Sequence, residues 1–346
     1  MSKLFQSKVF VKLKVQYIQK ILISVTLFVL IFLITLYIKN TPRDVSNVNG
    51  SEIQLSSEKT IAAWIWESPP KLAKDWLNII EFSKEHQINT IYLYVDEYLD
   101  IYELPETQER KRRLDEFTNA LRYEVMIANS RGISIHTLSG NTYWVDDEFS
   151  YLPVLITDFV LDFNKKYQDS KIGGMQFDIE FYNDTNFKRY KKRYTYSYLN
   201  LVNNLTERTN MQTEVDDLQL GFTIPFWFDD QDSILEEDIL EMLFATLSKV
   251  PNSYIAVMAY RNKVEGKNGI IEVSEGELKL SELYPVKVII GQEVLENDDK
   301  NITHFGKSKN EIKKELAKII DFAGKYENFE GISIHDLHGF MSAGDY

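Results

Sequence analysis

The chain has 346 residues, of which 44% are hydrophobic and 13% aromatic, and this composition excludes an intrinsically disordered protein. It contains no cysteine, so disulfides, thiolate catalysis, cysteine-ligated metal sites and a lipoprotein anchor are excluded as well. The formal net charge is −13, and it is distributed unevenly along the chain.

The first distinct element is the segment 21–38, which is uncharged and apolar around its whole circumference. A helix of this length reaches about 27 Å, close to the thickness of the hydrocarbon core of a bilayer. Five lysines precede the segment, whereas only Lys39 and Arg43 closely follow it. The positive-inside rule therefore places the basic N-terminus, 1–20, in the cytoplasm. Because no small-x-small cleavage site follows, we expect 21–38 to be an uncleaved transmembrane signal anchor.

Residues 39–58 are polar and aperiodic, and we expect a flexible tether there, followed by a single extracytoplasmic domain over 59–346. Residues 1–58 hold seven basic and three acidic side chains, a net charge of +4, which leaves −17 for the rest of a chain whose total is −13. An acidic exported domain disfavours nucleic acid as a partner and favours a neutral substrate or a cationic partner.

Beyond residue 59, short apolar runs alternate with longer amphipathic ones. The strands predicted from the short runs are Ile61–Trp66, Thr90–Asp96, Ile133–Ser139, Gly174–Glu180, Leu220–Trp227, Tyr254–Tyr260, Lys287–Glu293 and Gly331–Asp336. The helices predicted from the long runs are 71–86, 108–131, 151–168, 187–209, 233–248 and 308–326. The connection 262–285 is irregular and predicts only a short helix.

Strands separated by helices are expected to be parallel, because a crossover helix returns the chain to the same edge of the sheet. Eight such units predict an α/β fold of the (β/α)₈ TIM-barrel class. The chain stops ten residues after Asp336, so the last helix should be short or missing. An open doubly wound sheet is the alternative, but no Gly-x-Gly-x-x-Gly turn follows the first strand.

Polar residues gather at the carboxyl ends of these strands, where the active sites of such barrels lie. The candidates are Asp96, His136, Gln176, Asp178, Glu180, Trp227, Tyr260, Glu293 and His335. His136 and His335 could instead be satisfied core histidines. Asp178 and Glu180 carry more weight, because both lie on the inward face of the fourth strand, opposite Met175, Phe177 and Ile179.

The fourth strand, Gly-Gly-Met-Gln-Phe-Asp-Ile-Glu over 173–180, resembles the Asp-Gly-x-Asp-x-Asp-x-Glu signature of family-18 glycoside hydrolases, the chitinases and their relatives. Met258-Ala259-Tyr260 is similar to that family's Met-x-Tyr motif. The sequence departs from the family at Gln176, where an aspartate is usual, and at Arg261, where an acid or amide is usual. The segment 287–340 also looks like poorly characterised bacterial glycosidase-like barrel proteins.

The resemblance implies cleavage of an N-acetylhexosamine-containing glycan, such as a cell-wall glycan. With the predicted anchor, this reaction would take place at the outer face of the cell membrane. Glu180 would be the general acid, Asp178 would stabilise the substrate's attacking acetamido group, and Tyr260 would hydrogen-bond it. From their positions on the strands, we also expect sugar contacts from Gln176, Asp96, His136, Trp227, Glu293 and His335.

Physical chemistry agrees with this assignment, since a charged Asp178 should raise the pKa of Glu180 and keep it protonated. Two alternatives stay open: a retaining glycosidase that uses Glu180 and Glu293, and a barrel that binds glycan without cleaving it. A metal-dependent deacetylase is disfavoured because no His-x-x-x-His pair occurs, and we expect neither a metal nor another cofactor.

Overall fold

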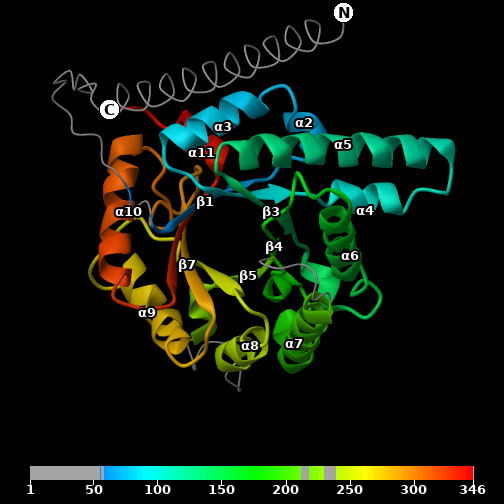
Figure 1. Ribbon diagram of the computed structural model, residues 1–346. Coiled ribbons are helices and arrows are strands. Elements are labelled where there is room, and N and C mark those ends of the chain that lie inside the picture. Colours follow the sequence, from blue (N-terminus) through cyan, green and yellow to red (C-terminus); the bar gives the residue numbers. More distant parts are fainter. Residues whose placement is uncertain (1–54, 56–57, 212–217, 230–238, 346) are drawn as a thin grey trace, which may run out of the picture. The chain divides into compact units, whose positions relative to one another are not determined.

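The computed structural model describes residues 55, 58–211, 218–229 and 239–345, which belong to the compact unit Glu52–Tyr346. Within these residues eight parallel strands form a closed barrel, in which each strand pairs with its sequence neighbours and β8 pairs with β1 (Figure 1). The strands are β1 Thr60–Ile65, β2 Thr90–Tyr94, β3 Ser134–Ser139, β4 Gly174–Phe177, β5 Gln219–Pro225, β6 Tyr254–Met258, β7 Lys287–Glu293 and β8 Phe329–His335. The predicted (β/α)₈ barrel is therefore confirmed, and the doubly wound sheet is excluded.

Helices connect the strands and surround the barrel (Figure 1). They are α2 Pro69–Leu72, α3 Trp76–Glu85, α4 Glu97–Tyr102, α5 Gln108–Ser130, α6 Leu152–Lys166, α7 Phe187–Met211, α8 Ile239–Leu247, α9 Ile270–Ser281, α10 Lys309–Ala323 and α11 Leu337–Ser342. Three 3₁₀ turns, η1 Thr142–Val145, η2 Phe181–Asn183 and η3 Phe226–Asp229, follow β3, β4 and β5. α11 has six residues, which agrees with the short last helix expected from the sequence.

The strand alternation divides the core into two layers. Outward-facing side chains such as Ile61, Ala63 and Ile65 of β1 pack under the helices. Inward-facing side chains fill the barrel: Ala62, Trp64, Tyr92, Leu138, Tyr254, Ala256 and Ile289. The rings of Trp64 and Tyr92 lie 5.3 Å apart between centroids, and those of Tyr92 and Tyr254 lie 6.1 Å apart. These side chains thus form a packed layer inside the barrel.

Several elements differ from their predicted bounds. β2, β4, β5 and β6 end two or three residues earlier than expected, so Asp96, Asp178, Glu180, Trp227 and Tyr260 all follow their strands. Asp178, Glu180 and Tyr260 follow in irregular backbone, whereas Trp227 lies on η3 and Asp96 directly precedes α4. The sequence pattern cannot distinguish these residues from residues of a strand. The connection 262–285 holds α9, a helix of 12 residues that is longer than expected. The segment 71–86 is divided between α2 and α3.

Among the residues that the structure describes, no helix is both long enough and apolar enough to cross a membrane. The predicted anchor, 21–38, lies outside them, as do the basic N-terminus and nearly all of the tether.

Candidate functional site at the carboxyl end of the barrel

Asp178 and Glu180 lie just beyond the end of β4. The Asp178 amide donates to the Ser139 carbonyl of β3 at 2.8 Å, which extends the pairing of the two strands. A Cβ atom at Gly140 would lie 2.0 Å from the Asp178 carbonyl oxygen, so this close approach requires glycine. Ile179 packs in the outer core, and the two acids therefore face the opposite way, into the open end of the barrel.

The electrostatics of this pair differ from those of an exposed carboxylate. Burial raises the pKa of Asp178 to about 7, and the charge of Glu180 acts in the same direction, while His335 opposes both. One oxygen of Asp178, Oδ1, is buried without a hydrogen-bond partner among the described residues. Glu180 Oε2 accepts a hydrogen bond from Asn183 Nδ2 at 2.6 Å. Burial is thus the main cause of the raised pKa of Asp178, the first acid of the pair.

Tyr260 follows β6 and faces the same space. Burial raises the pKa of its phenol, and the charges of Glu293, Asp178 and Glu180 raise it further. Its ring stacks on the His335 imidazole with 5.8 Å between centroids. A neutral phenol donor therefore lies within electrostatic range of three carboxyl groups.

A hydrogen-bonded chain joins the ends of β1, β8 and β7. Trp66 Nε1 donates to His335 Nε2 at 2.8 Å, so this imidazole nitrogen acts as an acceptor and the proton is on Nδ1. His335 Nδ1 then donates to Glu293 Oε2 at 2.9 Å, and the Leu295 amide donates to Glu293 Oε1 at 2.7 Å. Burial opposes the charged form of His335, but the hydrogen bond and charge of Glu293 outweigh it, and the pKa of His335 is raised.

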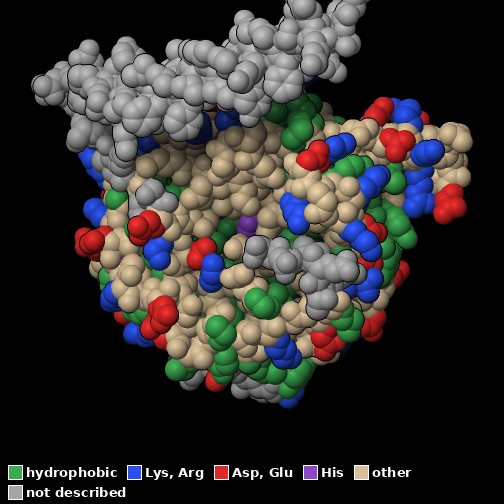
Figure 2. Space-filling view, viewed as in Figure 1, with side chains coloured by type: hydrophobic (Ala, Val, Ile, Leu, Met, Phe, Trp, Pro, Cys, Tyr) green, Lys and Arg blue, Asp and Glu red, His purple; other side chains and the backbone are tan. Residues whose placement is uncertain are grey.

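Asp178, Glu180, Tyr260, Glu293 and His335 together form what we call the mouth of the barrel. All of them are candidates from the sequence. In Figure 2, which looks onto one end of the barrel, a histidine side chain is visible near the centre, and charged side chains lie mostly around the perimeter.

Asp96 and Trp227 lie at the same end of the barrel but have other partners. The Gly140 amide donates to Asp96 Oδ2 at 3.3 Å, and burial raises the pKa of Asp96 to about 7. Trp227, on η3, makes an edge contact with Tyr182 at 4.9 Å between centroids. Tyr182 in turn lies close enough to Glu180 for that charge, after burial, to raise the pKa of its phenol. Asp96 and Trp227 are thus connected to the mouth indirectly, Asp96 through Gly140 and Trp227 through Tyr182.

Gln176 and His136 lie deeper, in a layer that we call the floor and that also contains Trp64, Tyr92 and Tyr254. Trp64 Nε1 donates to Gln176 Oε1 at 2.5 Å, and Gln176 is fully buried. His136 Nδ1 lies 3.1 Å from the Tyr254 hydroxyl, and burial lowers the pKa of His136 to about 3. Although both were predicted to contact sugar, the structure does not bring either side chain to the open part of the site.

Three mouth contacts were not among the predicted site residues: Trp66, Tyr182 and Asn183. The alternation of Trp64 with Trp66 signals that both face inward, but not that the second one reaches the rim. Tyr182 and Asn183 directly follow the fourth-strand signature, and this position was the available signal. No group of three or more acidic or histidine side chains suited to a metal ion occurs in the part of the chain that the structure describes.

The protein is thus a (β/α)₈ barrel with carboxyl groups gathered at the carboxyl ends of its strands. No protein-family model matches its sequence, and no curated protein matches it. Among solved structures it is similar to a GH18 chitinase from Pseudoalteromonas aurantia, with a TM-score of 0.51 and 14% identity over 80% of this chain and 93% of the other. The predicted likeness to family-18 barrels is confirmed at the level of the fold.

Two further structures are similar to the barrel. A GH18 chitinase from Cycas revoluta in complex with (GlcNAc)3 has a TM-score of 0.48 and 12% identity over 81% of this chain and 95% of the other. The spore cortex-lytic enzyme SleL from Bacillus megaterium QM B1551 has a TM-score of 0.45 and 12% identity over 82% and 72%.

Proposed function

We propose that this chain is a glycoside hydrolase that cleaves an N-acetylhexosamine-containing glycan, with Glu180 as the general acid and Asp178 assisting. The observation that carries the proposal is a pair of carboxyl groups in which the charge of Glu180 acts on Asp178, and in which Asp178 Oδ1 is buried with no hydrogen-bond partner among the described residues. Buried carboxyl groups with strongly raised pKa values concentrate at catalytic sites. The neutral phenol of Tyr260 beside the pair supports the same function, and the fold is one that chitinases use.

The reaction would use the substrate's own acetamido group. Its oxygen forms a bond to the anomeric carbon while the bond from that carbon to the glycosidic oxygen breaks, and Glu180 gives its proton to the leaving oxygen. The ionised Asp178 accepts a hydrogen bond from the acetamido N–H, and Tyr260 donates one to the acetamido oxygen. Water then opens the cyclic intermediate, and Glu180 takes back a proton.

The proton balance of the pair suits this sequence of steps. Because burial and the charge of Glu180 raise the pKa of Asp178 to about 7, two ionised carboxylates are disfavoured and the pair retains one proton near neutrality. A substrate N–H that donates to Asp178 stabilises its charged form, as the role proposed for Asp178 requires.

A direct nucleophilic role for Glu293 is less well supported. Both of its oxygens already accept hydrogen bonds, one from His335 and one from the Leu295 amide. Glu293 is also only 7% exposed. These contacts fit a residue that fixes His335 beside Tyr260 better than one that attacks a sugar.

We also propose that residues 21–38 anchor the enzyme in the cell membrane with the barrel outside the cytoplasm. The support is the sequence: an uncharged apolar run of sufficient length and the lysines that precede it. Protease added to intact cells should digest the chain beyond residue 40, whereas protection of that region would contradict this orientation.

The hydrolase proposal is tested with full-length protein, its Glu180→Gln variant and its Asp178→Asn variant on N-acetylated oligosaccharides and their de-N-acetylated counterparts. The wild type should cleave only the N-acetylated set, and Glu180→Gln should lower kcat by about 10²–10⁴-fold. Wild-type activity in either variant would eliminate the role assigned to that residue. Binding without any release of product would establish instead a glycan-binding barrel.

A further inference from the structure

A polar cavity of about 280 Å³ lies beside the mouth, between the loops that follow β6 and β7. Its lining includes Arg261, Lys263, Asp299 and three asparagines, Asn262, Asn268 and Asn301. Arg261 directly follows Tyr260, so the cavity adjoins the site proposed for the acetamido group. Planar amides and a guanidinium are the side chains that hydrogen-bond sugar hydroxyls and acidic groups.

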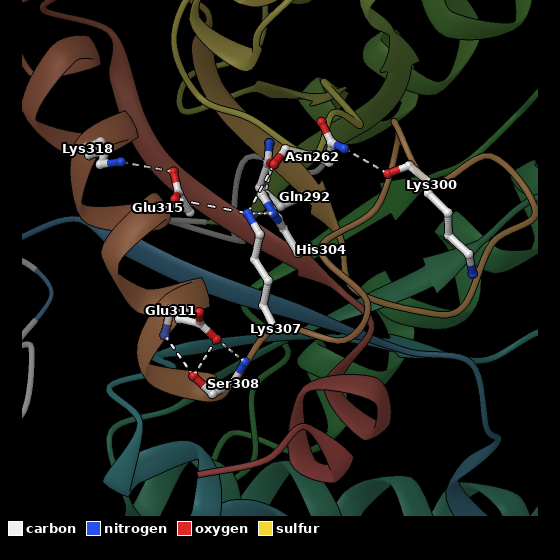
Figure 3. A network of polar contacts seen from close by, with 9 residues as sticks. All are labelled: Asn262, Gln292, Lys300, His304, Lys307, Ser308, Glu311, Glu315 and Lys318. Carbon is white, nitrogen blue, oxygen red and sulfur yellow. Dashed lines mark hydrogen bonds and ion pairs between the residues drawn. The ribbon is translucent and has the colours of Figure 1, made fainter. Parts of the chain in front are cut away.

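The walls of this cavity are held together by a network of polar contacts (Figure 3). Asn262 Nδ2 donates to the Lys300 carbonyl at 2.9 Å, and Lys307 Nζ donates to the Asn262 carbonyl at 3.0 Å. Lys307 Nζ also donates to His304 Nδ1 at 2.9 Å, so the other ring nitrogen, Nε2, carries the proton toward Gln292 Oε1 at 3.3 Å. The cavity is therefore tied to β7 and is formed before any ligand binds.

Arg261 is held in one orientation within this cavity. Its guanidinium lies over the Phe226 ring at 4.1 Å, Nη1 donates to the Tyr260 carbonyl at 2.7 Å, and Nε donates to Asn268 Oδ1 at 3.1 Å. Its Nη2 group makes no hydrogen bond to the described residues. The one carboxylate of the lining, Asp299, accepts two hydrogen bonds from Asn301 through Oδ1, and its charge partly offsets the burial that lowers the pKa of Arg261. A half-buried guanidinium with a free edge is suited to an anionic group.

A second cationic feature lies after β4, at the start of α7. Five of the six residues over 188–193 are basic, although the chain beyond residue 58 has a net charge of −17. Lys188 and Arg189 are exposed, and the Arg189 guanidinium lies 5.2 Å from the ring of Tyr190, which is 44% exposed. η2, which packs against this segment, connects it to Glu180. Exposed aromatic rings among cations can stack on sugars while the charges attract an acidic chain.

We propose that the glycan cleaved at the mouth is anionic, with an acidic substituent bound by Arg261 and the chain attracted by the basic segment 188–193. This inference rests on the proposed function and narrows its substrate class to N-acetylhexosamine chains that carry carboxylate or phosphate groups. It revises the expectation of a neutral substrate, which was based on net charge alone.

The test uses three soluble polymers with the same N-acetylglucosamine backbone: neutral glycol chitin, carboxymethyl chitin and phosphorylated chitin. Full-length protein in neutral detergent should cleave one of the anionic polymers with at least tenfold higher kcat/KM than glycol chitin. The preferred polymer identifies the acidic group. High salt should reduce the preference, because exposed charges are screened.

Matched variants locate the source of the preference. Arg261→Gln and the triple variant Lys188→Gln, Arg189→Gln, Lys191→Gln should each lower the ratio of anionic to neutral kcat/KM by about tenfold, mainly through KM. The control is Lys165→Gln, Lys166→Gln, Lys171→Gln. These exposed lysines lie in the last turn of α6 and between α6 and β4, at the opposite end of the barrel, and their removal should leave the ratio unchanged.

The outcomes separate this inference from the proposed function. Equal cleavage of neutral and anionic polymers, with no selective effect of Arg261→Gln, would overturn the inference and leave the hydrolase standing. If no polymer is cleaved, the hydrolase fails, and affinity electrophoresis decides the inference. Retardation by an anionic polymer only, lost in Arg261→Gln, would support it, and equal or absent retardation would overturn it.

Discussion

On β4 and its extension, Gln176 and Asp178 are two residues apart and face the same interior, one in the floor and the other at the mouth. Gln176 is fully buried among aromatic rings; its Oε1 accepts a hydrogen bond from Trp64, whereas its Nε2 has no partner among the described residues. Asp178 is buried with an oxygen that has no partner among the described residues, and its pKa is raised. Each of the two side chains has one buried polar atom without a partner, but the same strand face changes over two residues from a neutral amide to an ionisable carboxyl group with a raised pKa.

This difference predicts which of the two side chains destabilises the folded state more. A buried polar group with a partner is close to neutral in its effect on folding, whereas a buried carboxyl group without one destabilises the folded state. If the mouth is catalytic, substitutions there should change activity strongly and stability favourably. Substitutions in the floor should do the reverse.

The largest expected effect is that of Asp178→Asn on the rate. Loss of the carboxylate that assists the acetamido group should lower kcat by about 10²–10³-fold on an N-acetylated substrate. The pH–rate profile of the wild type should have a limb near pH 7, because burial and the charge of Glu180 raise the pKa of Asp178 to about 7. The variant should lack this limb. A profile that keeps this limb in the variant would assign it to another group.

The same variant should be more stable than the wild type at neutral pH. The folded pKa of Asp178, about 7, lies above its ordinary value of 3.8, so the folded state binds more protons between these pH values and loses stability as pH rises through them. Asparagine does not titrate, and it should stabilise the protein by on the order of 1–4 kcal/mol at pH 7. Urea unfolding at pH 4 and pH 7 measures the difference.

A new charge in the floor should have the opposite consequence. Gln176→Glu places a carboxylate in a fully buried site among aromatic rings, which should lower the free energy of unfolding by about 3–5 kcal/mol. Asn183→Asp is the matched control at the mouth, since it makes the same amide-to-acid change on an exposed side chain. Its effect on stability should stay within about 1 kcal/mol. Similar losses in both variants would remove the distinction between floor and mouth.

A buried acid away from the mouth, Glu124 of α5, tests whether burial alone accounts for these effects. Both of its carboxyl oxygens lack hydrogen-bond partners among the described residues, and burial raises its pKa to about 9 from an ordinary value of 4.5. Stability should fall as pH rises between those values, and Glu124→Gln should remove this slope, adding on the order of 3 kcal/mol at pH 7. Because Glu124 lies outside the mouth, kcat should not change.

The fold was predictable from the sequence because strands and helices differ in period, and the rhythm of the two specifies a barrel. The gathering of Glu180, Tyr260 and Glu293 was predictable for a related reason, since the carboxyl ends of parallel strands meet at one end. The ends of β3 and β7 were predicted correctly, but those of β2, β4, β5 and β6 were not. Polar residues that continue the alternation after β4 or β6 look the same in the sequence as residues of the strand.

The depth of a side chain within the barrel also could not be predicted from the sequence. Alternation tells which face a side chain occupies but not its height along the barrel axis, so His136 and Gln176 could not be separated from the mouth residues. The hydrogen bond between Trp66 and His335 joins residues 269 positions apart, and no local pattern signals it. Such pairs depend on how the barrel closes between β1 and β8.

The smallest expected effect concerns that hydrogen bond. Trp66→Phe keeps an aromatic ring at the rim but removes the donor to His335 Nε2, which should lower stability by about 1 kcal/mol. Burial opposes protonation of His335, and Glu293 already raises its pKa in spite of that. Without an N–H facing Nε2, this nitrogen can accept a proton, so the His335 pKa should rise further. NMR titration of the ring measures the shift, and His335→Gln identifies the signal. An unchanged titration would mean that the indole does not control the protonation of His335. Hydrogen bonds would then fix the side chains of the mouth less firmly than those of the floor.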